Sequence, residues 1–376
     1  MFMKKAISGL TALIIVAVVC LGFYVFMLYK DITAESSEGI RYYADSASGC
    51  CVAVDLGTCT DKELVIGNYI DGYKVTSIHE YAFAFEDHLA SVKINDSVLV
   101  IEDHAFSLDT KLEYVYIGAG VREIGDNVFN GCNSLKEIEV SRKNQHFKSI
   151  DGNLYTKDGS RLIHYSAGND RTEFRVPDGV TTISSFAFFG NKNLTKITLP
   201  DSVKTIERNA FYNCRALTEI NLPEGLESVG EYSFIGCDSL TSVVIPSTAS
   251  ILDKVFSECD NLSSVTISHG VDKIGNYAFD NCTALESIYI PATVKSIGRR
   301  AFSGCTGLSY AVIEKGVEFI GCDAFHRCGN LTDIYFTGSE EEWNSVVIEE
   351  DRAYGDYVPN DYLSHVTIHF NYNPNN

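Results

Sequence analysis

The chain has 376 residues, of which 50 are acidic and 30 are basic, so its formal net charge at pH 7 is −20. A surface this acidic repels the phosphate backbone of nucleic acids, and we expect no nucleic-acid partner. Hydrophobic residues make up 45% of the chain, which is enough to bury the core of one large domain or of two or three smaller ones.

Residues 1–30 predict a signal anchor, that is, a helix that holds the chain in a membrane. Lys4 and Lys5 precede 24 residues without a charged side chain, from Ala6 to Tyr29. At about 1.5 Å per residue this helix reaches about 36 Å, which is enough to cross a hydrocarbon core of about 30 Å. The lysine pair favours a cytoplasmic N-terminus, so we expect a membrane-anchored protein whose remaining part is extracytoplasmic. The alternative is a secreted protein, with cleavage after Ala34.

A repeat of 23 residues organises the rest of the chain. Ten phenylalanines follow one another at spacings of 22 or 23 residues, apart from one spacing of 59, and we number each repeat from its phenylalanine. Position minus five is Ile or Val in every repeat, position plus six is always Leu, and positions plus nine and plus eleven are mostly branched apolar residues. The ten phenylalanines are Phe83, Phe106, Phe129, Phe188, Phe211, Phe234, Phe256, Phe279, Phe302 and Phe325.

This pattern predicts a coil in which every turn, or rung, sends its apolar side chains toward a shared axis. Positions plus nine and plus eleven have a period of two, which is typical of a short strand. One rung cannot bury its apolar residues alone, whereas stacked rungs bury them against their neighbours. We therefore expect the strands to form a parallel sheet along one face of the stack, at about 4.8 Å per rung.

The repeat VxxIxxxAFxxCxxLxxIxIPxx resembles the leucine-rich repeat of the Treponema pallidum type, which is found in BspA-like surface proteins. The resemblance covers roughly residues 39–370. It implies an α/β-type repeat solenoid: a leucine-rich-repeat right-handed coil with a parallel sheet on one face, ten 23-residue repeats, terminal caps and one hairpin insertion. It also implies attachment to host proteins or to other cells, without naming the ligand.

The insertion and the end of the chain fit the same resemblance. FKSIDGNLYTKDGSRLIHYSAG, residues 147–168, resembles the hairpin-bearing insertion of that family, with Asp158 and Gly159 at the hairpin turn. Ser339 followed by Glu342 predicts a capping box that opens a short helix, from which Trp343 docks on the last rung. A final strand over residues 365–370 then closes the core.

These features divide the chain into six segments. We expect the anchor at 1–30, a linker and N-terminal cap at 31–74, repeats one to three at 75–143, the insertion at 144–179, repeats four to ten at 180–338, and the C-terminal cap and tail at 339–376.

Seven of the 12 cysteines occupy position plus three, which indicates one recurring structural role. A nucleophile is needed only once and beside a base, and a zinc site needs four convergent ligands, so a column of buried thiols is the favoured interpretation. Disulfides between neighbouring rungs remain an alternative, since an extracytoplasmic compartment favours them. Position plus three is Glu86, Asp109 or Asn191 in three other repeats, from which we expect this position to lie toward a rim. Near the N-terminus, one disulfide is possible within the cap cysteines, which are Cys50, Cys51 and Cys59.

Positions plus eight and plus ten alternate with the core positions and should face solvent. Tyrosines concentrate there in two places, Tyr114 with Tyr116 in the second repeat, and Tyr289, Tyr310 and Tyr335 in the last three repeats. Exposed tyrosines on a rigid sheet are typical anchors of protein interfaces, although tyrosine also simply suits strands. The sequence therefore predicts a protein-binding patch, above all at Tyr289, Tyr310 and Tyr335.

The function that these observations favour is that of a non-catalytic cell-surface protein that mediates protein–protein binding or adhesion. The alternative is a structural envelope spacer or assembly component without a diffusible ligand. We identify no catalytic, cofactor-binding or metal-binding residues, and we expect a protein partner and membrane contact through the N-terminal helix only.

Overall fold

The computed structural model describes residues 36–349 and 363–374. The expected signal anchor and the alternative cleavage site after Ala34 lie outside these residues. The chain divides into two compact units. The N-terminal unit runs to Val128 and includes Val140–His146, and the C-terminal unit comprises Phe129–Glu139 and the chain from Phe147 onward.

The N-terminal unit contains two sheets. In the first, β1 pairs antiparallel with β2, and β2, β5, β7 and β9 follow one another in parallel, with β4 paired to β5. In the second, β3, β6 and β8 are parallel neighbours. The strands are β1 (Arg41–Asp45), β2 (Cys50–Asp55), β3 (Glu63–Ile66), β4 (Tyr69–Ile70), β5 (Tyr73–Ile78), β6 (Ser91–Ile94), β7 (Val100–Ile101), β8 (Tyr114–Ile117) and β9 (Glu123–Ile124).

The C-terminal unit contains the insertion, where β11, β12 and β13 form an antiparallel meander with Asp158 and Gly159 between β12 and β13. Its first strands are β11 (Phe147–Ile150), β12 (Asn153–Thr156), β13 (Arg161–His164), β14 (Glu173–Arg175), β15 (Thr182–Ile183), β16 (Lys196–Thr198), β17 (Thr205–Ile206), β18 (Glu219–Ile220) and β19 (Ser228–Val229). β10 (Glu137–Val140) is divided between the two units. The predicted hairpin insertion is confirmed.

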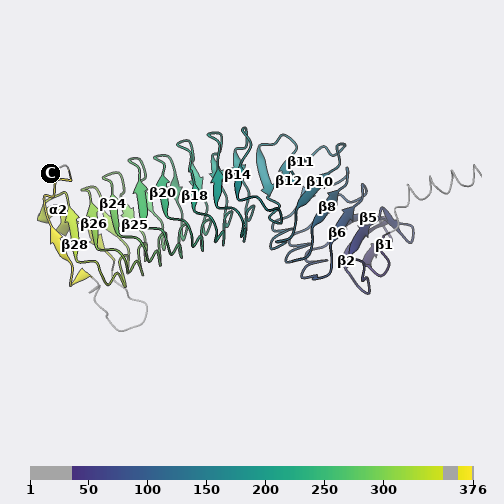
Figure 1. The fold of residues 1–376 in the computed structure, drawn as a ribbon, viewed down its shortest axis with the longest axis horizontal. Helices are drawn as coiled ribbons and strands as arrows, with labels where there is room; N and C mark the ends of the chain where they lie inside the picture. The colour runs from purple at the N-terminus through teal and green to yellow at the C-terminus, as the bar shows by residue number, and fades with distance from the viewer. Residues whose placement is uncertain (1–35, 350–362, 375–376) are drawn as a thin grey trace, which may run out of the picture. The chain divides into compact units, whose positions relative to one another are not determined.

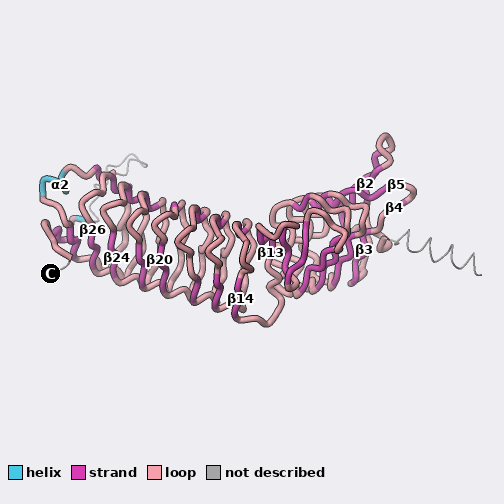
Figure 2. The backbone as a smooth tube through the Cα atoms, turned by 90° about the horizontal axis from the view of Figure 1, so that it is seen from above, coloured by secondary structure: helices cyan, strands magenta, loops and turns pink. Residues whose placement is uncertain are grey.

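The remaining rungs repeat one plan, which Figures 1 and 2 show as strands joined by loops and turns. The long strands pair in the order β20, β22, β24, β26, β28 and β30, and short strands pair in the order β23, β25, β27 and β29. These elements are β20 (Ser242–Ile245), β21 (Ser250–Ile251), β22 (Ser264–Ile267), β23 (Lys273–Ile274), β24 (Ser287–Ile290), β25 (Ser296–Ile297), β26 (Tyr310–Ile313), β27 (Phe319–Ile320), β28 (Asp333–Phe336), α2 (Glu340–Asn344), β29 (Val347–Ile348) and β30 (Thr367–His369).

Each rung therefore carries two parallel ladders where the sequence predicts one. The long strands occupy positions plus eight to plus eleven, as β24 does relative to Phe279, and they confirm the predicted parallel sheet. The short strands occupy positions minus six and minus five, as β23 does, and pair in register with the next rung. Within the described residues the repeats contribute no helix, and α2 belongs to the C-terminal cap. The fold is a parallel-sheet solenoid, as predicted, with turns where an α/β repeat would have helices.

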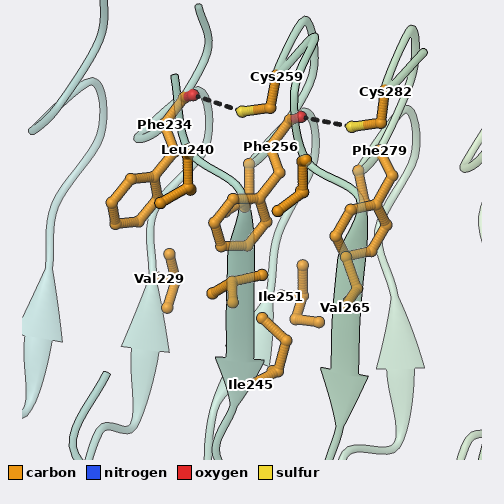
Figure 3. Close-up of a cluster of buried hydrophobic side chains, with 14 of the residues drawn as sticks. Val229, Phe234, Leu240, Ile245, Ile251, Phe256, Cys259, Val265, Phe279 and Cys282 are labelled. Carbon is orange, nitrogen blue, oxygen red and sulfur yellow. Dashed lines mark hydrogen bonds between the residues drawn. The ribbon is translucent and has the colours of Figure 1, made fainter. Parts of the chain in front are cut away.

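The repeat phenylalanines form a continuous buried column in the C-terminal unit. Neighbouring rings stack from Phe188 to Phe325, for example at 4.8 Å between the centroids of Phe188 and Phe211 and at 5.6 Å between those of Phe256 and Phe279. The interplanar angles are 13° and 4° for these two pairs. Offset ring pairs at this separation add to the free energy of burial. Figure 3 shows three of these rings with the Leu, Ile and Val side chains that surround them.

The turn around each phenylalanine has a special backbone. Positions minus two and plus two both have φ between +50° and +80° in all ten rungs. In the rung of Phe279, for example, the N–H groups at minus two, zero and plus two donate to the following rung: Tyr277 to the carbonyl of Arg299 at 2.8 Å, Phe279 to that of Ala301 at 2.8 Å and Asn281 to that of Ser303 at 2.7 Å. Right-handed and left-handed backbone conformations alternate in this turn, and the alternation directs these three N–H groups to the same side. The left-handed positions are therefore needed for the hydrogen bonds between stacked rungs.

The cysteines at plus three are buried thiols that donate to the preceding rung. Cys259 Sγ lies 3.2 Å from the carbonyl oxygen of Phe234, and Cys282 Sγ lies 3.1 Å from that of Phe256 (Figure 3). The same bond recurs in each rung from Cys214 to Cys328, and the described cysteines are free. The expectation that plus three lies toward a rim is wrong, because Asp109 and Asn191 are also buried there. A short polar side chain fits this position because each rung offers it backbone partners.

The C-terminal cap has the predicted parts. The Ser339 side chain accepts a hydrogen bond from the N–H of Glu342 at 3.2 Å, and the Glu342 carboxylate accepts one from the N–H of Ser339 at 2.8 Å. The Trp343 ring packs against Phe336 of the last rung, with centroids 5.2 Å apart. β30 pairs in parallel with β28, so the final strand closes the long-strand sheet.

Candidate functional site

The predicted tyrosine patch lies on the sheet formed by β24, β26, β28 and β30. Register places Tyr289, Val312, Tyr335 and His369 in one row across these strands. The neighbouring row holds Ser287, Tyr310, Asp333 and Thr367. Apart from Val312, which is buried, both rows alternate with the buried positions of the same strands. The three tyrosines of the prediction are therefore on one face of one sheet.

Tyr335 is the centre of this face. Its ring stacks on His369, with centroids 4.7 Å apart and an interplanar angle of 13°, and it meets Tyr372 at 4.8 Å. Tyr310 approaches it edge to face at 6.0 Å and 80°. We call Tyr310, Tyr335, His369 and Tyr372 the aromatic cluster. Such ring contacts hold the side chains in fixed orientations before a partner arrives, which reduces the entropy lost on binding.

Tyr310 is the member of the cluster that is open to solvent. It is 42% exposed, whereas Tyr289, Tyr335, His369 and Tyr372 are half-buried. A large ring held at its edge by a neighbour and free elsewhere offers contact area to a partner.

Tyr289 has a structural role. Its hydroxyl donates to Oε1 of Glu314 at 2.5 Å, and Oε2 of the same carboxylate accepts from the N–H of Ala292 at 2.7 Å. Burial, together with this carboxylate, raises the pKa of Tyr289 to about 12. The hydroxyl of Tyr289 is thus engaged within the protein, although its ring remains on the same face.

Val312 departs from the prediction that position plus ten faces solvent. It is only 7% exposed, because Tyr289 and Tyr335 flank it in the same row. Two large rings on either side of a smaller side chain cover it, so the surface here is a continuous aromatic strip.

His369 and Tyr372 are the members of the site that sequence reasoning missed. His369 Nε2 lies 2.6 Å from Oδ1 of Asp333, and hydrogen bonds from His369 and Thr332 lower the pKa of the Asp333 carboxyl. The alternation of HVTIHF predicts the strand but assigns the histidine no partner. The signal that could have found it is the pairing of this strand with the last repeat, which places His369 beside Tyr335.

Tyr114 and Tyr116 belong to the N-terminal unit. They lie on β8, half-buried, in register with Ser91 and Lys93 of β6. They form a second pair of tyrosines on a sheet face, in a different unit from the aromatic cluster.

The cap cysteines are free thiols in the structure. Cys50 and Cys51 are neighbours on β2, so their side chains point to opposite faces. Cys51 and Cys59 are both buried near the hydroxyl of Tyr42; burial raises the pKa of Tyr42 to about 12, and the two thiols add to the rise. The cap disulfide stays a prediction, and Cys51 with Cys59 is the pair that this placement favours.

The described surface includes a hollow in each unit. One of about 630 Å³ in the N-terminal unit is lined by residues that include Tyr42, Tyr43, His79 and Glu102. One of about 470 Å³ in the C-terminal unit lies at the ends of β14 and β16 and includes Arg175 and Asn221. Within residues 36–349 and 363–374, no three His, Cys, Asp or Glu side chains gather so that they could hold a metal ion.

Among the described residues, no helix is both long enough and apolar enough to cross a bilayer.

Comparison with solved structures finds bacterial repeat proteins. A leucine-rich repeat protein from Eubacterium ventriosum is 25% identical, with 72% of this chain and 93% of that protein covered and a TM-score of 0.48. A leucine rich cell surface protein from Faecalibacterium prausnitzii is 21% identical, with 84% and 98% covered and a TM-score of 0.46. The pneumococcal vaccine antigen PcpA is 22% identical, with 74% and 69% covered and a TM-score of 0.50, which supports the fold alone.

The search of curated proteins finds no match. The family model of the BspA type leucine rich repeat region matches six copies, over residues 67–158, 164–252 and 229–351. These residues are most of the chain and include all ten repeat phenylalanines together with the first strands of the insertion, and the match indicates a repeat family and no enzymatic one. The chain belongs to the family of BspA-type leucine-rich repeat proteins.

Proposed function

We propose that this chain is a non-catalytic protein of the cell surface that binds a protein partner through the aromatic cluster on the C-terminal sheet. The observation that carries the proposal is Tyr310, a large exposed ring whose orientation is fixed by Tyr335. Aromatic side chains held in this way are the typical anchors of protein interfaces. The ring row from Tyr289 to His369 supplies a flat apolar surface around it.

The surface location has two supports. Residues 6–29 have the length and composition of a membrane anchor, and the BspA-type repeat family to which the chain belongs is one of surface proteins. We infer that residues from Asp31 onward are displayed outside the membrane, where they meet proteins of other cells. Protease treatment of intact cells tests this, because an exposed repeat region is degraded while the cells remain closed.

Site-specific photo-crosslinking tests the partner directly. A photoreactive phenylalanine analogue at position 310, in the full chain on living cells, should form one dominant crosslinked product with a protein of another cell or of the host. The same analogue at Tyr69, an exposed tyrosine of the N-terminal unit, is the matched control and should not form that product. Crosslinks at position 310 to envelope proteins of the same cell alone would instead favour a structural spacer and contradict the proposal.

A further inference from the structure

Position plus two shows an irregularity in the first two rungs of the N-terminal unit. This position has a positive φ in every rung, and in the other eight rungs it holds Gly131, Gly190, Asn213, Gly236, Glu258, Asn281, Gly304 and Arg327. In the first two rungs it holds Phe85 with φ +67° and Leu108 with φ +65°. Glycine and asparagine adopt this left-handed conformation readily, whereas a large apolar L-residue does so with strain.

The strain at Phe85 and Leu108 is not offset by burial. Phe85 is 65% exposed and Leu108 is 42% exposed, so neither side chain contributes much to the core. A strained residue that does nothing for packing is an indication of function when it recurs at equivalent positions. Both residues also expose a large apolar side chain to water, which is unfavourable in the free protein.

The two residues are neighbours in the stack. The N–H of Phe85 donates to the carbonyl of Ser107 at 2.9 Å, which sets the two turns one rung apart. Position minus two of the first rung is Tyr81, 48% exposed, whose ring stacks on His104 at 4.6 Å. The first two rungs thus expose Tyr81, Phe85 and Leu108, which we call the apolar patch. In a soluble protein, grouped exposed apolar side chains mark interaction sites.

The surroundings of the apolar patch are acidic. Residues 79–113 contain two lysines and eight acidic side chains, of which Asp109 is buried and the other seven are not. Asp87 is exposed two residues after Phe85, and Glu80 and Asp103 are exposed immediately before Tyr81 and His104. Positively charged groups are therefore attracted to the edge of the apolar patch, and anionic surfaces are repelled from it.

We propose that the apolar patch binds a protein segment that carries apolar side chains flanked by lysine or arginine. The apolar side chains cover Phe85 and Leu108, and the cations meet the carboxylates of Glu80, Asp87 and Asp103. An anionic membrane does not fit, since the acidic rim opposes it. A second copy of the chain does not fit either, because it would bring two acidic rims together. This surface lies in the N-terminal unit and is separate from the aromatic cluster.

A peptide titration with matched variants of the full chain tests the proposal. The probes are the synthetic peptides KKFLKK, EEFLEE and KKSSKK, and the test variant is Phe85→Asn with Leu108→Asn. Asparagine occupies the same left-handed position in Asn213 and Asn281, so the variant should fold and should melt no lower than the parent chain. We expect KKFLKK to bind the parent chain at least tenfold more tightly than EEFLEE or KKSSKK does. We also expect KKFLKK to bind the double variant at least tenfold more weakly than it binds the parent chain.

The control is Glu258→Asn, which changes the same position in the C-terminal unit and should leave peptide binding within twofold. Equal affinity of KKFLKK for the parent chain and the double variant would overturn the proposal, as would equal binding of EEFLEE. Sedimentation equilibrium gives an independent check. A parent chain that self-associates while the double variant stays monomeric would show that a second copy occupies the apolar patch, and would also overturn it.

Discussion

The buried carboxyl of Asp109 predicts how the unfolding free energy of the N-terminal unit depends on pH. Asp109 occupies the plus-three position that holds a thiol in most rungs, and its side chain is fully buried. Oδ1 accepts a hydrogen bond from the N–H of Glu86 at 2.7 Å, whereas Oδ2 has no partner among the described residues. Burial raises the pKa of this carboxyl to about 8, although the hydrogen bond from the N–H of Glu86 lowers it; the negative charge of the Glu86 side chain adds to the rise.

The sign and size of the effect follow from proton linkage. An unfolded aspartate has a pKa of about 3.9, so between about pH 4 and pH 8 the folded chain binds a proton that the unfolded chain has lost. The free energy of unfolding therefore falls as pH rises through this window. At about 1.4 kcal/mol per pH unit the loss is about 4 kcal/mol by pH 7, since about three units separate pH 7 from the unfolded pKa.

Asp109→Asn should remove this pH dependence. The amide keeps the acceptor for Glu86 and stays neutral at every pH, as Asn191 does at the same position of another rung. We expect the variant to match the parent chain near pH 4 and to exceed its unfolding free energy by about 4 kcal/mol at pH 7. Asp87→Asn, at an exposed site two residues after Phe85, is the matched charge control and should change stability by less than about 0.5 kcal/mol.

The assay is urea unfolding at pH 4.5, 7 and 8.5, each sample receiving the same brief deuterium pulse at one common pH. Mass spectrometry of peptides from residues 79–112 then reports the N-terminal unit by itself. A raised pKa of Asp109 is refuted if Asp109→Asn changes the unfolding free energy by the same amount at pH 4.5 as at pH 8.5, or if it destabilises the unit at pH 7.

Three further predictions concern the stack and its caps. Iodoacetamide should leave Cys259 and Cys282 unmodified in the native chain and modify both in urea, because burial raises the pKa of these thiols and excludes the reagent; mass spectrometry that finds native labelling would contradict this. Phe256→Ala should lower the unfolding free energy of the C-terminal unit by about 3–5 kcal/mol, since it removes a ring stacked on both sides, and a loss below about 1 kcal/mol by urea titration would be too small for this role. The intact mass of the alkylated chain tests the bridge between Cys51 and Cys59. If the bridge is present, reduction before alkylation frees two more thiols and raises the mass by two alkyl adducts, whereas identical masses with and without reduction would exclude the bridge.

The core of each rung could be predicted from the sequence because its signal repeats ten times. Phe at zero and Leu at plus six are buried in all ten repeats, and Ile at minus five is buried in every repeat that has it except at the half-buried Ile124; Ile274, Phe279 and Leu285 are examples. From one repeat alone the fold would be ambiguous. Ten repeats at a fixed spacing are consistent with a coil in which the same positions of every turn face a shared axis. The capping box at Ser339 and the hairpin turn at Asp158 are equally local signals, and both were predicted.

What the sequence could not supply depends on the backbone and on neighbours. The left-handed turns at minus two and plus two leave only a partial preference for Gly and Asn, because residues such as Tyr277 and Lys254 also adopt them. The short ladder at minus six and minus five spans two residues per rung, too few for a recognisable alternation. The hydrogen bond from Cys282 to the carbonyl of Phe256 is set by stacking and has no sequence signature.

The candidate site was predicted only in part, because some of its contacts also depend on neighbouring rungs. Alternation placed Tyr289, Tyr310 and Tyr335 on the sheet face, and the structure finds them there. It could not show that Glu314 holds the Tyr289 hydroxyl, or that His369 stacks on Tyr335, because both depend on segments that meet only in the folded stack. The apolar patch had a signal that alternation does not use: Phe85 and Leu108 replace the Gly, Asn or charged residue found at plus two.

The measurement that tests the proposed function most directly is the affinity of the crosslinked partner for the full chain with Tyr310→Ser. We expect at least a tenfold loss of affinity with an unchanged melting temperature, because Tyr310 is exposed and its removal costs contact area with the partner while leaving the core intact. Tyr69→Ser, which removes an exposed tyrosine from the N-terminal unit, should bind as the parent chain does. Equal affinity of the parent chain and the Tyr310→Ser variant would contradict the claim that the aromatic cluster is the binding site.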